Sequence, residues 1–267
     1  MQVLFFILLF VLGTCFGSFL CCQARRLHLK ATNKRAKPLG NRSVCLKCHY
    51  RLKWYDNIPV LSWLFLRGHC RKCHAKIGLA ELFSELGLGV AFLLIGTTID
   101  PLTADPWSWA LFAIALIFML ITGFLAIYDG LYGELPTKYL VLAIIVAFIH
   151  LIVREASLII QVGYAPSLIT DPLFAVLILG GLYCVLYCFS KGKWVGDGDW
   201  LLATALAIVL FYPFVSLVSL FLANLLASAI MAPFVILRKN HRIYFGPFLV
   251  AAFVIAYSLA DFLLTVI

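Results

Sequence analysis

Long apolar runs are the feature that most constrains how this chain can fold. A helix needs about 20 mostly apolar residues to cross a bilayer. Charged residues make up 12% of the chain and hydrophobic residues 64%, a composition that excludes an ordinary soluble domain. We therefore predict an all-α polytopic membrane protein with about eight transmembrane helices. The eight candidate runs are Met1–Cys22, Glu81–Thr97, Trp107–Tyr128, Lys138–Val153, Pro172–Phe189, Asp199–Tyr212, Pro213–Leu237 and Tyr244–Ile267.

One polar insert interrupts this pattern. Residues 25–76 contain 14 of the 21 Lys and Arg residues and no run long enough to span a membrane. The predicted organisation is therefore a first transmembrane helix over residues 1–24, a cytosolic four-cysteine domain over residues 25–80, and a transmembrane bundle of about seven helices over residues 81–267.

The distribution of basic residues predicts the topology. Arg25, Arg26 and Lys30 follow the first apolar run, which is the reverse of the order in a cleavable signal peptide. We expect a retained helix whose N-terminus lies outside. Alternating eight helices from there places 20 of the 21 Lys and Arg residues on one side, which should be the cytoplasm. This rule also accounts for the net charge of +9, so no nucleic-acid partner is predicted.

Two Cys-x-x-Cys pairs predict a structural metal site in the insert. Cys45 and Cys48 are separated by 21 residues from Cys70 and Cys73, close to the spacing of zinc-ribbon-like modules in which four thiolates hold Zn²⁺. Four protein ligands leave no open position for chemistry, so the metal would stabilise the insert. One alternative is four reduced thiols without a metal. Disulfides are another, but they are rare in the reducing cytosol, where this insert is expected to lie.

Three acids lie beside apolar runs on the predicted cytoplasmic face. Asp129 ends one run, and Asp197 and Asp199 precede another within Gly196–Asp199. A carboxylate at a membrane rim is costly and is a hypothesis about function. Two close carboxylates share one proton, so that one activates water while the other donates to a carbonyl, as in aspartic proteases. We select Asp129 and Asp199 as the catalytic pair.

Each acid also has a structural interpretation. Asp199 can be the N-cap of the following helix, and Asp129 can be the first residue of an Asp-Gly turn. Asp197 lies in Gly-Asp-Gly, a typical turn sequence, and has the weaker claim to catalysis.

These motifs together resemble the bacterial type IV prepilin leader peptidase/N-methyltransferase family, membrane aspartyl proteases of the Gly-x-Gly-Asp type. The resemblance covers nearly the whole chain. It is carried by Gly17–Leu20 with Arg26, by residues 42–86 with the four cysteines and Trp54–Ser62, by Asp129 with Leu135 and Pro136, by Gly196–Asp199, and by Phe245–Leu249.

The resemblance implies an activity. Asp129 and Asp199 would remove the leader of membrane-inserted type IV prepilins or type II secretion pseudopilins, at the cytoplasmic face of a multi-pass protein of the bacterial inner membrane. It also implies N-methylation of the new N-terminus with S-adenosylmethionine as the methyl donor. The sequence offers no Gly-rich nucleotide motif that would mark a site for this cofactor.

Three positions depart from the family pattern. Cys21 stands where Asn is usual, Thr137 where Asp is frequent, and Leu201 where Lys is usual. The missing Lys removes a cation near the acids.

Two other classes of function were weighed. A proton- or cation-coupled transporter would place its acids near the bilayer midplane, whereas these acids gather at one face. A non-enzymatic membrane scaffold would tolerate replacement of both aspartates by asparagine.

Overall fold

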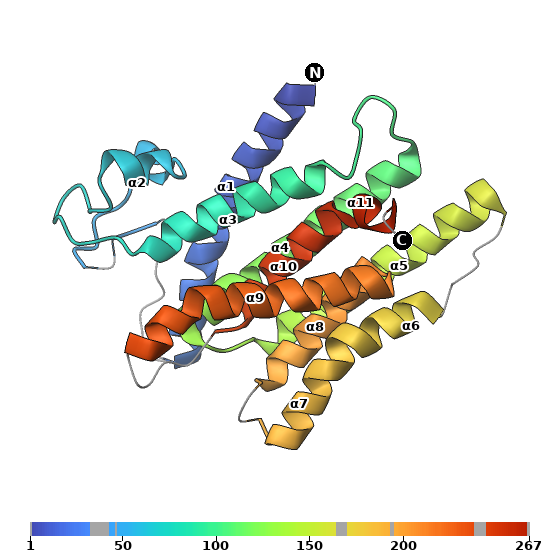
Figure 1. The fold of residues 1–267 in the computed structure, drawn as a ribbon. Coiled ribbons are helices and arrows are strands. Elements are labelled where there is room, and N and C mark those ends of the chain that lie inside the picture. The colour runs from blue at the N-terminus through green and yellow to red at the C-terminus, as the bar shows by residue number, and fades with distance from the viewer. Residues whose placement is uncertain are drawn as a thin grey trace. The chain divides into compact units, whose positions relative to one another are not determined.

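The structure is a computed structural model that describes residues 2–32, 43–45, 47–163, 170–192, 195–237 and 244–265. These residues are almost entirely helical, and their only β-type pairings are two isolated bridges. The predicted all-α membrane fold is confirmed. The chain divides into two compact units, Met1–Leu93 and Leu94–Ile267, which are described separately (Figure 1).

Each of the eight predicted runs contains at least one helix among the described residues. The first unit contains α1 (Gln2–Thr32), η1 (Trp54–Asn57), α2 (Leu61–Phe65) and most of α3 (Leu79–Gly96). The second contains α4 (Pro106–Tyr132), α5 (Thr137–Val162), the continuous rod α6 (Thr170–Val176), η2 (Leu177–Gly181) and α7 (Leu182–Ser190), then α8 (Asp197–Leu210), α9 (Pro213–Leu237), α10 (Gly246–Ser258) and α11 (Ala260–Thr265). Within the described ranges, six helical segments are long and apolar enough to cross a membrane, whereas α8 and α10 are shorter.

The first helix is longer than its apolar run. It continues through Arg25 and Arg26 to Thr32. Residues 18–32 contain no Gly or Pro, and those after the apolar run are mostly good helix formers. Glycines let α1 and α3 touch along their backbones. A Cβ at Gly13 would lie 2.8 Å from the Cα of Gly89, and one at Gly17 would lie 2.7 Å from the Cα of Glu85. This is close small-residue packing of a kind typical of membrane helices.

The second unit is a bundle whose successive helices run up and down. At one end, Gly133 between α4 and α5 packs on Tyr244, and Gly198 at the start of α8 packs on Leu135. At the other end, the guanidinium of Arg154 lies 3.5 Å above the ring of Phe211, which follows α8. Residues far apart in the sequence therefore meet at two opposite ends of one bundle.

Helix α8 is the centre of this bundle. It contacts α5, α6, η2, α7, α9 and α10, and every residue from Ala205 to Leu210 is buried. Its alanines allow neighbouring helices to approach closely. With 14 residues α8 is about 21 Å long, short for a bilayer. It begins at Asp197, inside the glycine-rich loop, and it is surrounded by protein, so its length need not match the lipid.

Candidate active site and metal centre

Asp129 lies in the last turn of α4 and is 6% exposed. Its Oδ2 accepts a 2.9 Å hydrogen bond from the backbone N–H of Gly246, the first residue of α10. A helix N-terminus carries a partial positive charge that stabilises a carboxylate. Because α4 continues to Tyr132, the Asp-Gly turn interpretation of Asp129 is wrong. The structure shows a buried acid held by the start of another helix.

Asp199 lies in the first turn of α8. The N-cap of this helix is Gly196, and Asp199 is the third helical residue, so the interpretation of Asp199 as N-cap is wrong in detail. The Oδ2 of Asp199 nevertheless accepts the N–H of Gly196 at 3.1 Å. A first-turn acid that bonds back to the N-cap residue stabilises the helix start. Asp199 is therefore well placed both to order the glycine-rich loop and to present a carboxylate.

The bundle brings the two selected acids to the same end. Gly198 touches Leu135, which follows α4, and Gly130 beside Asp129 lies against Pro247 of α10. The contacts of their neighbours therefore place the two acids at one end of the bundle. Asp197, in contrast, is exposed at the first position of α8.

Sequence reasoning did not identify the group that holds Asp129 or the contacts around the start of α10. The N–H of Gly246 holds Asp129 across 117 positions of the chain. The Tyr183 ring packs on Phe245 at 5.4 Å, and the Tyr183 hydroxyl accepts a 2.9 Å bond from Asn224. One sequence clue was available for Gly246. A Gly-Pro pair before an apolar run marks a helix start whose backbone N–H groups are open to a carboxylate.

The four predicted metal ligands converge in the first unit. The Sγ atoms of Cys45 and Cys73 lie 3.8 Å apart, those of Cys48 and Cys70 lie 4.0 Å apart, and all four lie within 4.8 Å of one another. Tetrahedral Zn–S bonds of about 2.3 Å require S···S separations of about 3.8 Å. All four cysteines are free thiols, so the disulfide alternative is not supported. The cluster can hold one metal ion.

Two equivalent turns build the cluster. The N–H of Cys45 bonds to the carbonyl of Tyr50, and the N–H of Cys70 bonds to the carbonyl of Ala75. Each turn is closed by an antiparallel bridge, Val44 to Arg51 in one and His69 to Lys76 in the other.

The histidines next to the cysteines complete these turns. His49 and His74 adopt left-handed backbone conformations with φ of 54° and 52°, and both side chains are exposed. His69 makes a 2.7 Å contact between Nδ1 and the carbonyl oxygen of Arg67. The four thiols therefore form the cluster, and these histidines lie around it.

Comparisons with known proteins place the chain in a family. The family model described as "Bacterial Peptidase A24 N-terminal domain" matches residues 11–99. The prepilin leader peptidase/N-methyltransferase of Vibrio cholerae serotype O1 is 28% identical over 262 residues, which are 96% of this chain and 98% of that protein. Proteins of the same name from Klebsiella pneumoniae and Neisseria gonorrhoeae are each 30% identical, over 74% and 82% of this chain and over 82% and 71% of their own lengths.

No solved structure gives a significant match. The alignment to the Vibrio cholerae protein covers 96% of the chain and so runs across both units. The extent and identity of the alignments to these relatives, together with the match of the N-terminal domain, lead to one conclusion: this chain is a member of the prepilin leader peptidase/N-methyltransferase family.

Proposed function

We propose that this chain is a membrane aspartyl endopeptidase that removes the leader of type IV prepilin or pseudopilin precursors and N-methylates the new N-terminus. One observation carries the peptidase assignment. Asp129 of α4 and Asp199 of α8 lie at the same end of the second unit. The transporter and scaffold alternatives are not favoured, because the relatives are named as peptidases.

The proposed chemistry needs only the two carboxylates and water. In each acid Oδ2 accepts a backbone N–H, so we expect Oδ1 to face the water. The ionised acid takes a proton from this water while the water oxygen attacks the scissile carbonyl carbon. The protonated acid donates its proton to the carbonyl oxygen. The tetrahedral intermediate collapses when the C–N bond breaks: the leaving amine takes up the proton that the first acid removed from water, and one hydroxyl of the intermediate returns its proton to the second acid as the C=O bond forms again.

The substrate and location follow from the family and the charge pattern. The relatives' names point to a membrane-inserted prepilin or pseudopilin as the partner. Six apolar helical segments indicate a multi-pass protein of the inner membrane. The distribution of Lys and Arg supports a cytoplasmic location for the Asp129 end. Of the cytoplasmic basic residues, Lys193, Arg238, Lys239, Arg242 and those within 33–42 lie outside the described residues.

Zinc and S-adenosylmethionine are the proposed cofactors. Four thiolates at tetrahedral separations suit Zn²⁺, which would be structural because the thiolates fill its coordination shell. S-adenosylmethionine, when bound, would supply the methyl group for the amine that cleavage exposes: the sulfonium S–CH₃ bond would break as the N–CH₃ bond forms, S-adenosylhomocysteine would leave, and the proton of the amine would pass to water.

Cleavage of a prepilin in membranes tests the peptidase assignment. We expect Asp129→Asn and Asp199→Asn each to lower the rate by at least about 10³-fold, as removal of a catalytic group does, and Asp197→Asn to cleave normally. The free energy of unfolding of Asp199→Asn should lie within about 1 kcal/mol of the wild-type value, because asparagine can still accept a hydrogen bond from the N–H of Gly196. Normal cleavage by either Asp129→Asn or Asp199→Asn would refute the assignment.

A further inference from the structure

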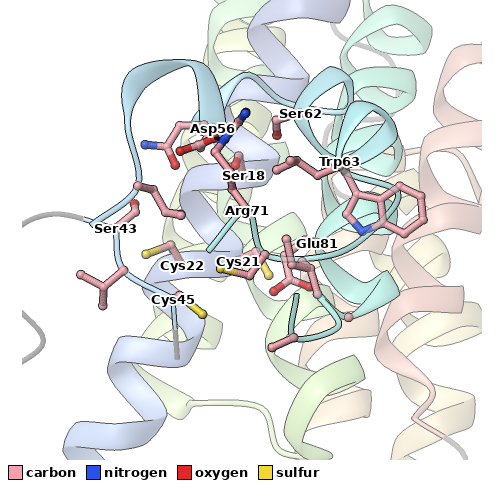
Figure 2. A pocket seen from close by; sticks show the side chains of 18 of the residues that line it. Ser18, Cys21, Cys22, Ser43, Cys45, Asp56, Ser62, Trp63, Arg71 and Glu81 are labelled. Carbon is pink, nitrogen blue, oxygen red and sulfur yellow. Dashed lines mark hydrogen bonds and ion pairs between the residues drawn. The ribbon is translucent and has the colours of Figure 1, made fainter. Parts of the chain in front are cut away.

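An open apolar groove of about 450 Å³ lies in the second unit, between the α6–α7 rod and α9. The rod lines it with residues of the π-helical segment Leu177–Gly181 and with Leu182 and Val185, and α9 lines it with Leu217 and Leu220. Short π-helical segments occur frequently at functional sites. The pocket that Figure 2 shows is a separate hollow, because all its lining residues belong to the first unit.

The groove starts close to the proposed active site and runs away from it. A Cβ at Gly180 would lie 3.0 Å from the Cα of Thr204 in α8. Thr204 follows Asp199 by five residues, or about 8 Å along the helix axis, so the groove residue Gly181 lies near that depth. Leu217 is one turn from the start of α9, which follows the far end of α8. The groove therefore extends from the level of Thr204 toward the end of the bundle opposite the acids.

One exposed polar side chain lies next to the groove on the apolar helix α9. Asn224 is near the middle of this 25-residue helix, one turn after the groove residue Leu220. Its Nδ2 donates to the carbonyl oxygen of Leu220 at 2.8 Å and to the hydroxyl of Tyr183 at 2.9 Å. Its Oδ1 accepts no hydrogen bond from the residues that the structure describes.

This amide oxygen indicates what covers the groove. Lipid tails can fill an apolar groove, but they offer no hydrogen-bond donor, and a polar group without a partner in hydrocarbon is costly. Asparagine side chains in membrane helices commonly bond to a neighbouring helix. Asn224 and the groove beside it therefore suit a second membrane helix that carries a donor at this depth.

A short chain of contacts connects Asn224 with the acids. Tyr183, which accepts from Asn224, packs its ring on that of Phe245 at a centroid distance of 5.4 Å. The next residue, Gly246, donates its N–H to Asp129. A helix that touches Asn224 is thus three contacts away from a proposed catalytic carboxylate.

The substrate proposed above has the geometry that this surface requires. If the leader of a membrane-inserted precursor is removed at the Asp129 end of the bundle, the apolar helix after the cleavage site must leave the acids toward the opposite end. The groove runs in this direction. We propose that the groove between the rod and α9 holds the apolar membrane helix of the precursor and that Asn224 bonds to it. The inference rests on the proposed function and names the surface that holds the substrate.

Photocrosslinking tests the occupant of the groove directly. Benzoylphenylalanine replaces Leu217 or Val185, which are 48% and 50% exposed, or as a matched control Ile145 of α5, which is 50% exposed. Each chain also carries Asp199→Asn, so that the precursor stays uncut, and is irradiated in membranes that contain a prepilin. We expect an adduct with the prepilin from positions 217 and 185 and at least about tenfold less from position 145.

A leucine at position 181 tests the groove in the active enzyme. Gly181 has a right-handed helical conformation, and a Cβ there would make only contacts of 3.7 Å or longer, so the chain should fold normally while the added side chain enters the groove. We expect Gly181→Leu to lower kcat/KM for prepilin cleavage at least about tenfold, mainly through KM. Gly87→Leu is the matched control, because a Cβ at Gly87 meets no described atom within 4 Å, and it should cleave normally.

A third pair of variants separates a bond to the substrate from support of Tyr183. Asn224→Leu removes the amide, and we expect KM to rise about three- to tenfold with kcat within about twofold of wild type. Tyr183→Phe removes only the hydroxyl that accepts from Asn224 and should leave KM within about twofold. Equal KM values for the two variants would show that Asn224 acts by holding Tyr183, which would overturn its role as a substrate contact.

The outcomes distinguish the groove from the proposed peptidase. Equal adducts from all three positions, or adducts only with lipid or with a second copy of the chain, would overturn the groove as the substrate surface. If wild type cleaves prepilin and positions 217 and 185 give no prepilin adduct, the groove is refuted and the peptidase stands. If those positions give the adduct but wild type cleaves nothing, the groove is supported and the peptidase is refuted.

Discussion

At the scale of single residues, the site depends on a glycine that carries no chemistry of its own. A Cβ at Gly246 would lie 2.9 Å from Oδ2 and 3.3 Å from Cγ of Asp129. These distances are shorter than ordinary van der Waals contact, so any side chain at position 246 would push the carboxyl group aside. The hydrogen bond from the N–H of residue 246 to Asp129 therefore requires glycine at this position.

Replacement of Gly246 by alanine should thus impair cleavage. We expect Gly246→Ala to lower the rate of prepilin cleavage about 10–100-fold, because displacement of a catalytic group by about 1 Å has effects of this size. Gly130→Ala is the control: its Cβ would meet only Cγ of Pro247, at an ordinary 3.5 Å. Initial rates in membranes with equal amounts of each variant provide the measurement. If the two variants cleave equally fast, Gly246 does not position Asp129.

The sequence identified residues whose chemistry is visible locally. Asp129 and Asp199 stand out because a carboxylate beside an apolar run is costly, and the cysteine spacing identifies a metal cluster. Gly246 and the Tyr183–Asn224 pair could not be recognised in this way. Their roles come from contacts across 117 and 41 positions, and such contacts depend on how the helices pack.

At the scale of elements, helix existence was predictable but helix ends and internal geometry were not. The run Pro172–Phe189 predicted one regular helix, whereas the structure contains a π-helical segment, Leu177–Gly181, within it. The sequence has only Gly180 and Gly181 as a clue. Glycine is needed at position 180 because of a neighbouring helix: a Cβ there would lie 3.0 Å from the Cα of Thr204 in α8. This close approach lets the rod pack on α8, which carries Asp199.

Adjacent glycines in this segment permit a matched stability test. We expect Gly180→Ala to lower the free energy of unfolding by about 1–3 kcal/mol, the usual effect of overpacking, because the backbone of α8 must shift. Gly181→Ala should have little or no destabilising effect, since its Cβ would make only contacts of 3.7 Å or longer. Thermal unfolding in detergent measures the difference. Equal melting temperatures for the two variants would show that α8 does not pack tightly against Gly180.

At the scale of the whole molecule, the charge pattern and the bundle agree. Asp129 and Asp199 lie at the end of the second unit that also holds the loop residues Gly133 and Leu135, on the predicted basic side. The one basic residue predicted on the other side, Arg154, stacks over Phe211 and donates a 2.8 Å bond to the hydroxyl of Tyr212. Arg154 is the one basic residue that departs from the positive-inside rule, and at the opposite end of the bundle its charge is held by these contacts with the protein.

The division into two units leads to a prediction about metal removal. The four thiols belong to the first unit, and both aspartates belong to the second. A small module with little core depends on its metal for folding. We expect Cys48→Ser to lose the bound zinc, because it removes one of the four thiolates. Cleavage should persist, because the helices that hold the acids pack within the second unit.

Two measurements on one preparation decide this prediction: zinc content by mass spectrometry and prepilin cleavage. Cys188→Ser is the matched control, since Cys188 is an exposed thiol of α7 in the second unit, and both properties should remain normal. Loss of cleavage together with zinc would show that the two aspartates cannot work without the four-cysteine module. Retention of zinc in Cys48→Ser would show that the four thiols do not form one site. Only loss of zinc with cleavage intact fits a peptidase site that is built within the second unit.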